Sequence, residues 1–156
     1  MTKEEFKAFC HEEFTGRGFR KHKNGYYMNG PEGLLCGMFL QKSNYGPSYY
    51  VNCCFHLQTP DDLRLPPPHD MDMDLRRIMV MTKSEHDQRG ETFLSASIDY
   101  EEYTVDELKP YFDREFDEHI LPAIRGGREY VKNNLDKFSL HILHPDRVMQ
   151  KLREDT

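Results

Sequence analysis

Residues 49–58, with the sequence YYVNCCFHLQ, decide the fold. Successive side chains of a β-strand point to opposite faces of a sheet, so alternate residues share one environment. One face then carries Val51, Cys53, Phe55 and Leu57, and the other carries Tyr50, Asn52, Cys54, His56 and Gln58. The first set is apolar and predicts a buried face. The second set predicts a more polar outer face, on which Gln58 is expected to be exposed.

Four more strand patterns surround this stretch. We expect a short strand at residues 25–29 and a longer one at 34–43, whose two apolar faces suit a central position in a sheet. Two more strands are expected at residues 75–82 and 92–100. Residues 59–74 are rich in Pro and Asp, which predicts a long surface loop between them. Together these segments predict about five antiparallel strands.

Helix signals stand near both ends of the chain. Thr2 with Glu5, and Thr104 with Glu107, have the spacing of an N-terminal capping box, and Pro145 is suited to open a last helix. Two prolines within the second helical pattern are expected to kink it. The sequence therefore predicts an α+β fold with an N-terminal helix, an antiparallel sheet of about five strands, and C-terminal helices packed on one face. A chain of 156 residues suits a single domain.

The composition disfavours several classes of protein. Lys and Arg total 21 and Asp and Glu total 27, and the formal charge of −6 opposes binding to phosphate backbones. No apolar run approaches the roughly 18 residues that a bilayer span needs, and the first residues lack the pattern of a secretion signal. Four cysteines without a C-x-x-C pair then suit reduced thiols. We therefore expect a cytoplasmic protein with no nucleic-acid or membrane partner.

Metal-binding and catalytic patterns are incomplete. His141 and His144 form a lone pair, whereas a zinc centre needs several convergent ligands. Residues 69–74 alternate carboxylates but lack the Gly and Glu positions of a calcium-binding loop. Residues 52, 54 and 56 have the side-chain types of a Cys-His-Asn hydrolase, but residues two apart on a strand stand about 6.5–7 Å from each other, beyond hydrogen-bond reach. The sequence thus predicts no metal, no cofactor and no catalytic residue.

Three segments carry a family resemblance. They are Gly18-Phe19-Arg20-Lys21, Gly25-Tyr26-Tyr27, and Phe39-Leu40-Gln41-Lys42-Ser43 with Tyr50-Val51-Asn52. These segments resemble the bacterial domain-of-unknown-function family numbered forty-three zero four. The resemblance is carried by the N-terminal segments. It implies a small, stand-alone, cytoplasmic bacterial protein, and it implies no activity, cofactor or catalytic residue.

A polar patch at one end of the sheet is the first candidate for binding. Its members are Arg20, Lys21, Gln41, Lys42, Ser43 and Asn52, with His56 as a further candidate. Such a patch could hold an anion or an acidic segment of a protein partner. In the alternative interpretation, Gln41 and Asn52 are structural residues that bond each other across neighbouring strands.

An acidic helix face is the second candidate for binding. Residues 99–118 contain nine acids and two basic residues, a net charge of −7. Asp106, Asp113 and Asp117 fall away from the apolar stripe of the predicted helix, and we expect no nearby cation to neutralise them. This face is either a solvated surface or a surface that steers a basic protein partner.

Two functions remain open from the sequence. The first is a non-enzymatic protein-binding module of the immunity or chaperone kind, suggested by fold-level analogy. The alternative is a hydrolase or transferase that acts on a small anionic substrate at residues 41–43, with His56 or His22 as the base. A homodimer is open as well, because the outer row of Tyr50, Cys54 and His56 needs cover from the C-terminal helices or from a second chain.

Overall fold

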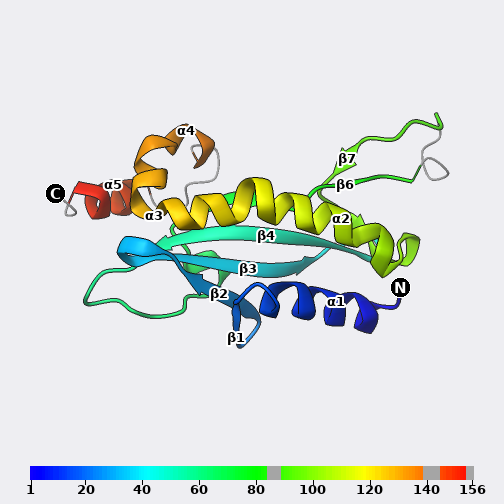
Figure 1. The fold of residues 1–156 in the computed structure, drawn as a ribbon, viewed down its shortest axis with the longest axis horizontal. Helices are drawn as coiled ribbons and strands as arrows, with labels where there is room; N and C mark the ends of the chain where they lie inside the picture. Colours follow the sequence, from blue (N-terminus) through cyan, green and yellow to red (C-terminus); the bar gives the residue numbers. More distant parts are fainter. Residues whose placement is uncertain (84–88, 139–144, 154–156) are drawn as a thin grey trace.

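The computed structural model describes residues 1–83, 89–138 and 145–153 of the chain. Figure 1 shows one antiparallel sheet with helices packed along one side of it, and a small two-stranded hairpin that projects beyond the sheet. Helices α1 and α5 lie toward opposite ends of the molecule. This arrangement confirms the predicted α+β fold. Within the described ranges, no helix is both long enough and apolar enough to cross a membrane.

The main sheet has the strand order β1-β2-β3-β4-β5, and β8 pairs with the start of β4. Its strands are β1 (Arg20–His22), β2 (Gly25–Asn29), β3 (Leu34–Lys42), β4 (Ser48–Leu57), β5 (Met73–Arg77) and β8 (Ile98–Asp99). The long strand β4 pairs with β3 from Leu57 to Tyr49 and with β5 on its other side. The stretch YYVNCCFHLQ is therefore an interior strand of the sheet. A separate hairpin pairs β6 (Val80–Met81) with β7 (Leu94–Ser95).

Helices α1 and α2 each start at an expected capping box. Thr2 Oγ1 accepts a hydrogen bond from the Glu5 N–H, Thr104 Oγ1 accepts one from the Glu107 N–H, and both glutamates bond back to the cap. The helices are α1 (Lys3–Thr15), α2 (Val105–Glu115), α3 (Leu121–Asn133), α4 (Leu135–Phe138) and α5 (Pro145–Arg153). A π-helical turn, Phe116–Ile120, joins α2 to α3. Pro122 follows it, and its missing N–H favours a local departure from α-helical bonding.

The helices cover the inner face of the sheet. Val51, Cys53, Phe55 and Leu57 are completely buried in a core that also contains side chains of α1, α2, α3 and α5. This burial confirms the predicted inner face of β4. Strand β3 is apolar on both faces, as expected, because Met38 lies in this core and Leu35 lies in a second cluster on the outer face.

A loop formed by residues 58–72 folds back over part of the outer face. Its Met71 packs against Phe39 and Cys54, and its Pro66 carbonyl accepts a hydrogen bond of 2.7 Å from the Tyr27 hydroxyl. Gly37 makes room for this packing, because a Cβ there would stand 2.7 Å from the Phe39 ring. Of the outer row of Tyr50, Cys54 and His56, this loop covers Cys54. Asp72 at the end of the loop lies beside His56 and bonds to Arg147 and Lys151 of α5, so a C-terminal helix approaches that end of the row, as one of the two expectations had it.

Two sequence expectations about strands need correction. Residues 75–82 do not form one strand, because β5 ends at Arg77 and the buried Ile78 separates it from β6. Residues 92–100 likewise divide into β7 and β8.

Gln58 is buried and not exposed as expected: its Oε1 accepts a hydrogen bond of 3.0 Å from Asn29 Nδ2, and its Nε2 donates to the Arg64 carbonyl. The returning loop causes this burial.

Candidate functional site

A groove lies between α1 and the adjacent end of the sheet and encloses about 540 Å³. It is lined by Lys7, Ala8, His11, Lys21, Asn24, Tyr26, Leu40, Lys42 and Tyr49. Helix α1, the β1–β2 hairpin and strands β3 and β4 therefore contribute side chains to one concave surface, which we name the basic groove.

Two tyrosines give the basic groove a rigid aromatic base. Tyr26 and Tyr49 are almost fully buried, with 7% and 4% of their surfaces exposed. The Tyr49 ring stacks on Phe6 with 5.6 Å between centroids, and Tyr26 packs edge-on against Phe14 at 5.0 Å. Because these partners belong to the core, the base of the groove is fixed by core packing.

His11 bonds directly to this base. Its Nδ1 lies 2.9 Å from the Tyr26 hydroxyl. Burial raises the pKa of Tyr26, so its hydroxyl keeps its proton at neutral pH. The contact fixes the His11 ring at the edge of the groove base.

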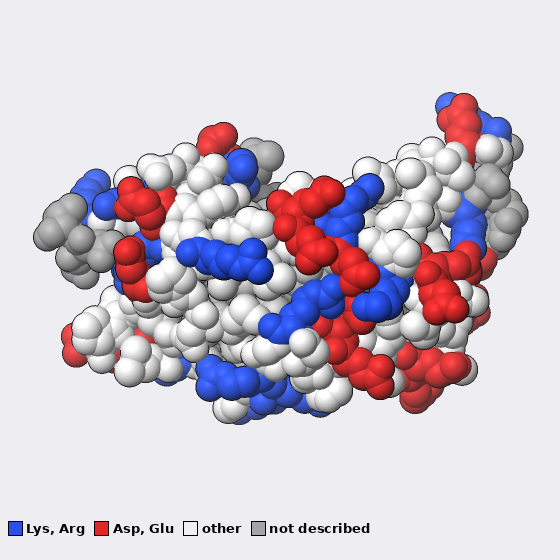
Figure 2. All heavy atoms as spheres, viewed as in Figure 1, with Lys and Arg blue, Asp and Glu red and all other residues white. Residues whose placement is uncertain are grey.

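The charged residues that line the basic groove all have one sign. Lys7, Lys21 and Lys42 are exposed, and the lining contains no Asp or Glu. Over the described part of the chain, none of these three lysines forms an ion pair. In Figure 2 basic side chains gather around the β1–β2 hairpin, whereas acidic side chains crowd over the region of α1 and α2. A concentration of positive charge therefore stands on a chain whose formal charge is −6.

The structure divides the predicted polar patch between the two faces of the sheet. Lys42 pairs with Tyr49 and lines the basic groove, whereas Gln41 pairs with Tyr50 and points to the outer face. Asn52 shares that outer face, and its Nδ2 donates a hydrogen bond of 2.9 Å to Gln41 Oε1. The bond between these two amides is the structural alternative expected from the sequence. The expectation of one continuous patch is corrected, because neighbouring strand residues alternate between faces.

Two other members of that patch also lie outside the groove lining. Arg20 Nη2 donates to Asn29 Oδ1 across the β1–β2 hairpin. Ser43 is buried, and its Oγ accepts a hydrogen bond from the Tyr45 N–H in the turn before β4. Of the predicted patch, only Lys21 and Lys42 lie in the basic groove.

His56 is buried away from both the groove and the outer-face amides. Only 1% of its surface is exposed, and its Nδ1 and Nε2 lie 3.4 Å from Asp72 and 3.8 Å from Asp62. Burial, only partly opposed by Asp72, lowers the pKa of His56. The ring is therefore neutral at pH 7 and closed to solvent, which removes it from the predicted binding patch.

The acidic helix face is partly neutralised. Asp113 Oδ1 forms ion pairs with Arg17 Nη2 at 2.5 Å and with Lys109 Nζ at 3.3 Å. The expectation that no cation lies near this residue is therefore wrong. Asp106 and Asp117 are exposed. The face is thus a mixed surface in which α1 and α2 exchange ion pairs.

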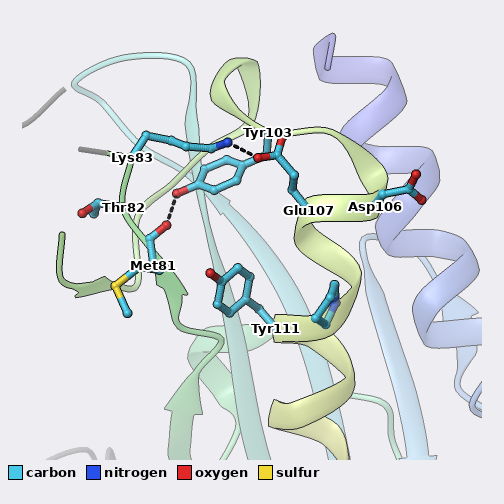
Figure 3. Close-up of a pocket in the computed structure, with 8 residues that line it drawn as sticks. Met81, Thr82, Lys83, Tyr103, Asp106, Glu107 and Tyr111 are labelled. Carbon is cyan, nitrogen blue, oxygen red and sulfur yellow. Dashed lines mark hydrogen bonds and ion pairs between the residues drawn. The ribbon is translucent and has the colours of Figure 1, made fainter. Parts of the chain in front are cut away.

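Asp106 also lines a second hollow, which lies between α2 and β6 and encloses about 440 Å³ (Figure 3). There the Tyr103 hydroxyl donates to the Met81 carbonyl at 2.7 Å, and Lys83 pairs with Glu107. Burial, with the nearby Tyr111, raises the pKa of Tyr103 to about 12, so the hydroxyl stays a donor. These contacts connect the β6–β7 hairpin to α2 and to the residues just before it. The Tyr103 hydroxyl and the Lys83 and Glu107 side chains are therefore bonded within the protein.

The cysteines have no arrangement for nucleophilic catalysis. Cys54 donates its thiol hydrogen to Asp74 Oδ1 at 3.1 Å, and burial raises the pKa of this thiol well above its ordinary value. A neutral thiol beside a carboxylate is a poor nucleophile. Among the residues that the structure describes, no group of three or more His, Cys, Asp and Glu side chains is arranged for a metal ion. His141 and His144 lie outside the described residues.

The fold and the groove define a class: a small α+β domain that presents a preformed cationic concavity beside its sheet. The chain belongs to the family described as Domain of unknown function (DUF4304), which matches residues 10–125. No curated protein and no solved structure matches the chain. The matched range begins within α1 and includes most of the groove lining.

Most groove residues were not predicted as site residues from the sequence, among them the basic residues of α1. Lys7 and His11 are four residues apart on α1, a spacing that places both side chains on one face of a helix. That spacing was a usable signal. What the sequence lacked was the packing angle that brings this helix face beside the β1–β2 hairpin.

Proposed function

We propose that this protein is a non-enzymatic binding module that holds an acidic segment of a protein partner in the basic groove. One observation carries the proposal: the groove lining contains three lysines and a histidine and no carboxylate, on a chain of net charge −6. Charges of one sign held together on a surface attract a ligand of the opposite sign and raise its association rate.

A peptide segment suits this groove better than a small anion. The cations come from α1, β1 and the end of β3, so they surround the groove and do not converge on one point. The half-buried Leu40 supplies apolar surface between them. Exposed ion pairs contribute only about 0–1 kcal/mol each, so useful affinity needs several carboxylates together with an apolar side chain packed on Leu40.

Two features support a binding role over catalysis. Catalysis would need Cys54 or His56, but the Cys54 thiol is bonded to Asp74 and His56 is buried away from solvent. Gln41 and Lys42, which the alternative anionic-substrate function placed in one site, project to opposite faces. The neutralisation of Asp113 also favours an acidic partner over the basic partner considered from the sequence.

The test is the binding of a fluorescein-labelled peptide of alternating Glu and Leu, followed by fluorescence anisotropy. We expect its Kd to rise at least tenfold in the double variant Lys21→Glu/Lys42→Glu and to rise steeply between about 50 and about 300 mM NaCl. Arg125→Glu is the matched control, because it reverses an exposed charge on α3 outside the groove lining, and it should change Kd less than twofold.

Three results would contradict the proposal. The first is equal weakening by the groove variant and the Arg125 variant. The second is tighter binding of a single-stranded oligonucleotide of the same charge, which would point to nucleic acid. The third is full displacement of the peptide by about 10 mM inorganic phosphate, which would point to a small-anion site.

A further inference from the structure

A separate hollow lies beside β5, mainly on the outer face of the sheet. It encloses about 370 Å³, near the lower end of the range for small-molecule sites. It is lined by Gln41, Asn52, Asp74, Arg76, Arg77, Met79 and Ala96. The 58–72 loop packs over the Cys54 region of this face, and the hollow lies further along β3, β4 and β5.

A chain of hydrogen bonds fixes Arg77 at this hollow. Arg77 Nε donates to Asn52 Oδ1 at 2.9 Å, and Asn52 Nδ2 in turn donates to Gln41 Oε1 at 2.9 Å. The Arg77 guanidinium also lies over the Tyr50 ring, 4.3 Å from its centroid. The side chain is therefore held in place through Nε and its flat face. Across the described residues, no partner is found for its two terminal nitrogens.

Asp74 presents the opposite charge to the same hollow. Its Oδ1 accepts the Cys54 thiol hydrogen, and no described residue bonds to its Oδ2. Asp74 forms no ion pair with Arg77 within the described chain, although both residues line the hollow. Arg76 does not neutralise Asp74, because its guanidinium is bound to the buried Glu115, with Nε 2.6 Å from Oε2.

The hollow thus holds one guanidinium and one carboxylate that are both fixed and do not neutralise each other. Unpaired opposite charges on a protein normally close into an ion pair or remain fully solvated. Here Arg77 is opposite Asn52 and Asp74 is opposite Cys54, so they are neighbours on one face, while the bond from Arg77 Nε to Asn52 directs the guanidinium to Asn52 and Tyr50. A ligand that carries both charges would satisfy both groups at once.

We propose that this hollow binds a free amino acid as a zwitterion. The ligand carboxylate accepts hydrogen bonds from the two terminal nitrogens of Arg77, whose fork matches a carboxylate. The ligand ammonium donates to Asp74 Oδ2. The ligand side chain lies against Met79 and Ala96, the apolar part of the lining. This site is independent of the basic groove.

Isothermal titration calorimetry with leucine, N-acetyl-leucine and leucinamide tests this proposal, and glycine and γ-aminobutyrate report the preferred charge separation. We expect at least one free amino acid to bind, with at least tenfold weaker binding of its acetylated and amidated forms. Arg77→Gln should weaken binding at least tenfold, and Arg77→Lys should lie between wild type and Arg77→Gln because it keeps the charge and loses the fork. Asp74→Asn should abolish the preference for leucine over N-acetyl-leucine.

Arg125→Gln serves as the control, since it removes an exposed guanidinium elsewhere. Thermal unfolding without ligand checks that each variant folds; if Asp74→Asn unfolds, the Arg77 series and the blocked ligands decide alone. Two results overturn the proposal: no heat of binding for any free amino acid at about 10 mM, or equal affinity for leucine and both of its blocked forms.

Discussion

Asp72 fastens the C-terminal helix to the sheet, and replacing it by Asn should loosen that attachment. The side chain is completely buried. Its Oδ1 accepts a hydrogen bond of 2.7 Å from Arg147 Nε, and its Oδ2 accepts bonds of 2.8 Å from Lys151 Nζ and from the Leu57 N–H. Although burial opposes the charged form, the bonds from Lys151 and Leu57 outweigh it and lower the pKa of Asp72.

The expected cost follows from the burial of both partners. The Lys151 side chain is only 10% exposed, so Asp72→Asn leaves an almost enclosed ammonium without its counter-charge. Removing one partner of a buried ion pair costs about 3–5 kcal/mol. Asn keeps an oxygen for the Leu57 N–H, and Arg147 is 39% exposed and can be solvated, so we expect about 3 kcal/mol.

Urea unfolding followed by circular dichroism at pH 7 measures this cost, with the exposed Asp61→Asn as the matched control. The control should change the free energy of unfolding by less than about 0.5 kcal/mol. The double variant Asp72→Asn/Lys151→Met should recover part of the loss, because it leaves no enclosed charge. A loss below about 1 kcal/mol for Asp72→Asn, or strict additivity in the double variant, would refute this reasoning.

Three further predictions concern β4 and its end. Phe55→Ala should lower the free energy of unfolding by about 3–5 kcal/mol, because the ring is fully buried against Phe138; a change below about 1 kcal/mol in urea unfolding would contradict the assigned inner face. Gln58→Ala should cost about 1–2 kcal/mol through its lost hydrogen bonds to Asn29 and Arg64, and a neutral result would return Gln58 to the exposed position expected from the sequence. The lowered pKa of His56 means that the folded protein binds fewer protons there than the unfolded chain, so stability should fall as pH drops below about 6.5; His56→Phe should flatten the pH dependence between pH 7.5 and 5.5, and an unchanged slope would contradict the assignment.

Local patterns predicted most of the fold. The two capping boxes placed the starts of α1 and α2, because a cap depends on residues three apart in the chain. Strict alternation placed both faces of β4 correctly from Tyr50 to Leu57. The break between Arg77 and Val80 was not predicted, because the apolar pattern continues through Ile78 while the chain leaves β4 there to form the separate β6–β7 hairpin.

The candidate site was predicted less well than the fold. Gln41 and Lys42 were assigned to one patch although strand alternation already separates adjacent residues, so the sequence contained the signal for that division. The burial of His56 and Gln58, by contrast, has no signal in the local sequence. It depends on the path of residues 58–72, and a proline-rich loop has no periodicity from which such a path can be derived.

The occupancy of the basic groove is tested most directly by two-dimensional ¹H–¹⁵N NMR during titration with the alternating Glu and Leu peptide. The account predicts that the largest amide shifts fall on α1 around Lys7 and His11, on the β1–β2 hairpin around Lys21, and at the end of β3 around Lys42, all saturating with one Kd. Shifts centred on the outer-face residues of β5 or on α2, or no saturable shift at about 1 mM peptide, would contradict it.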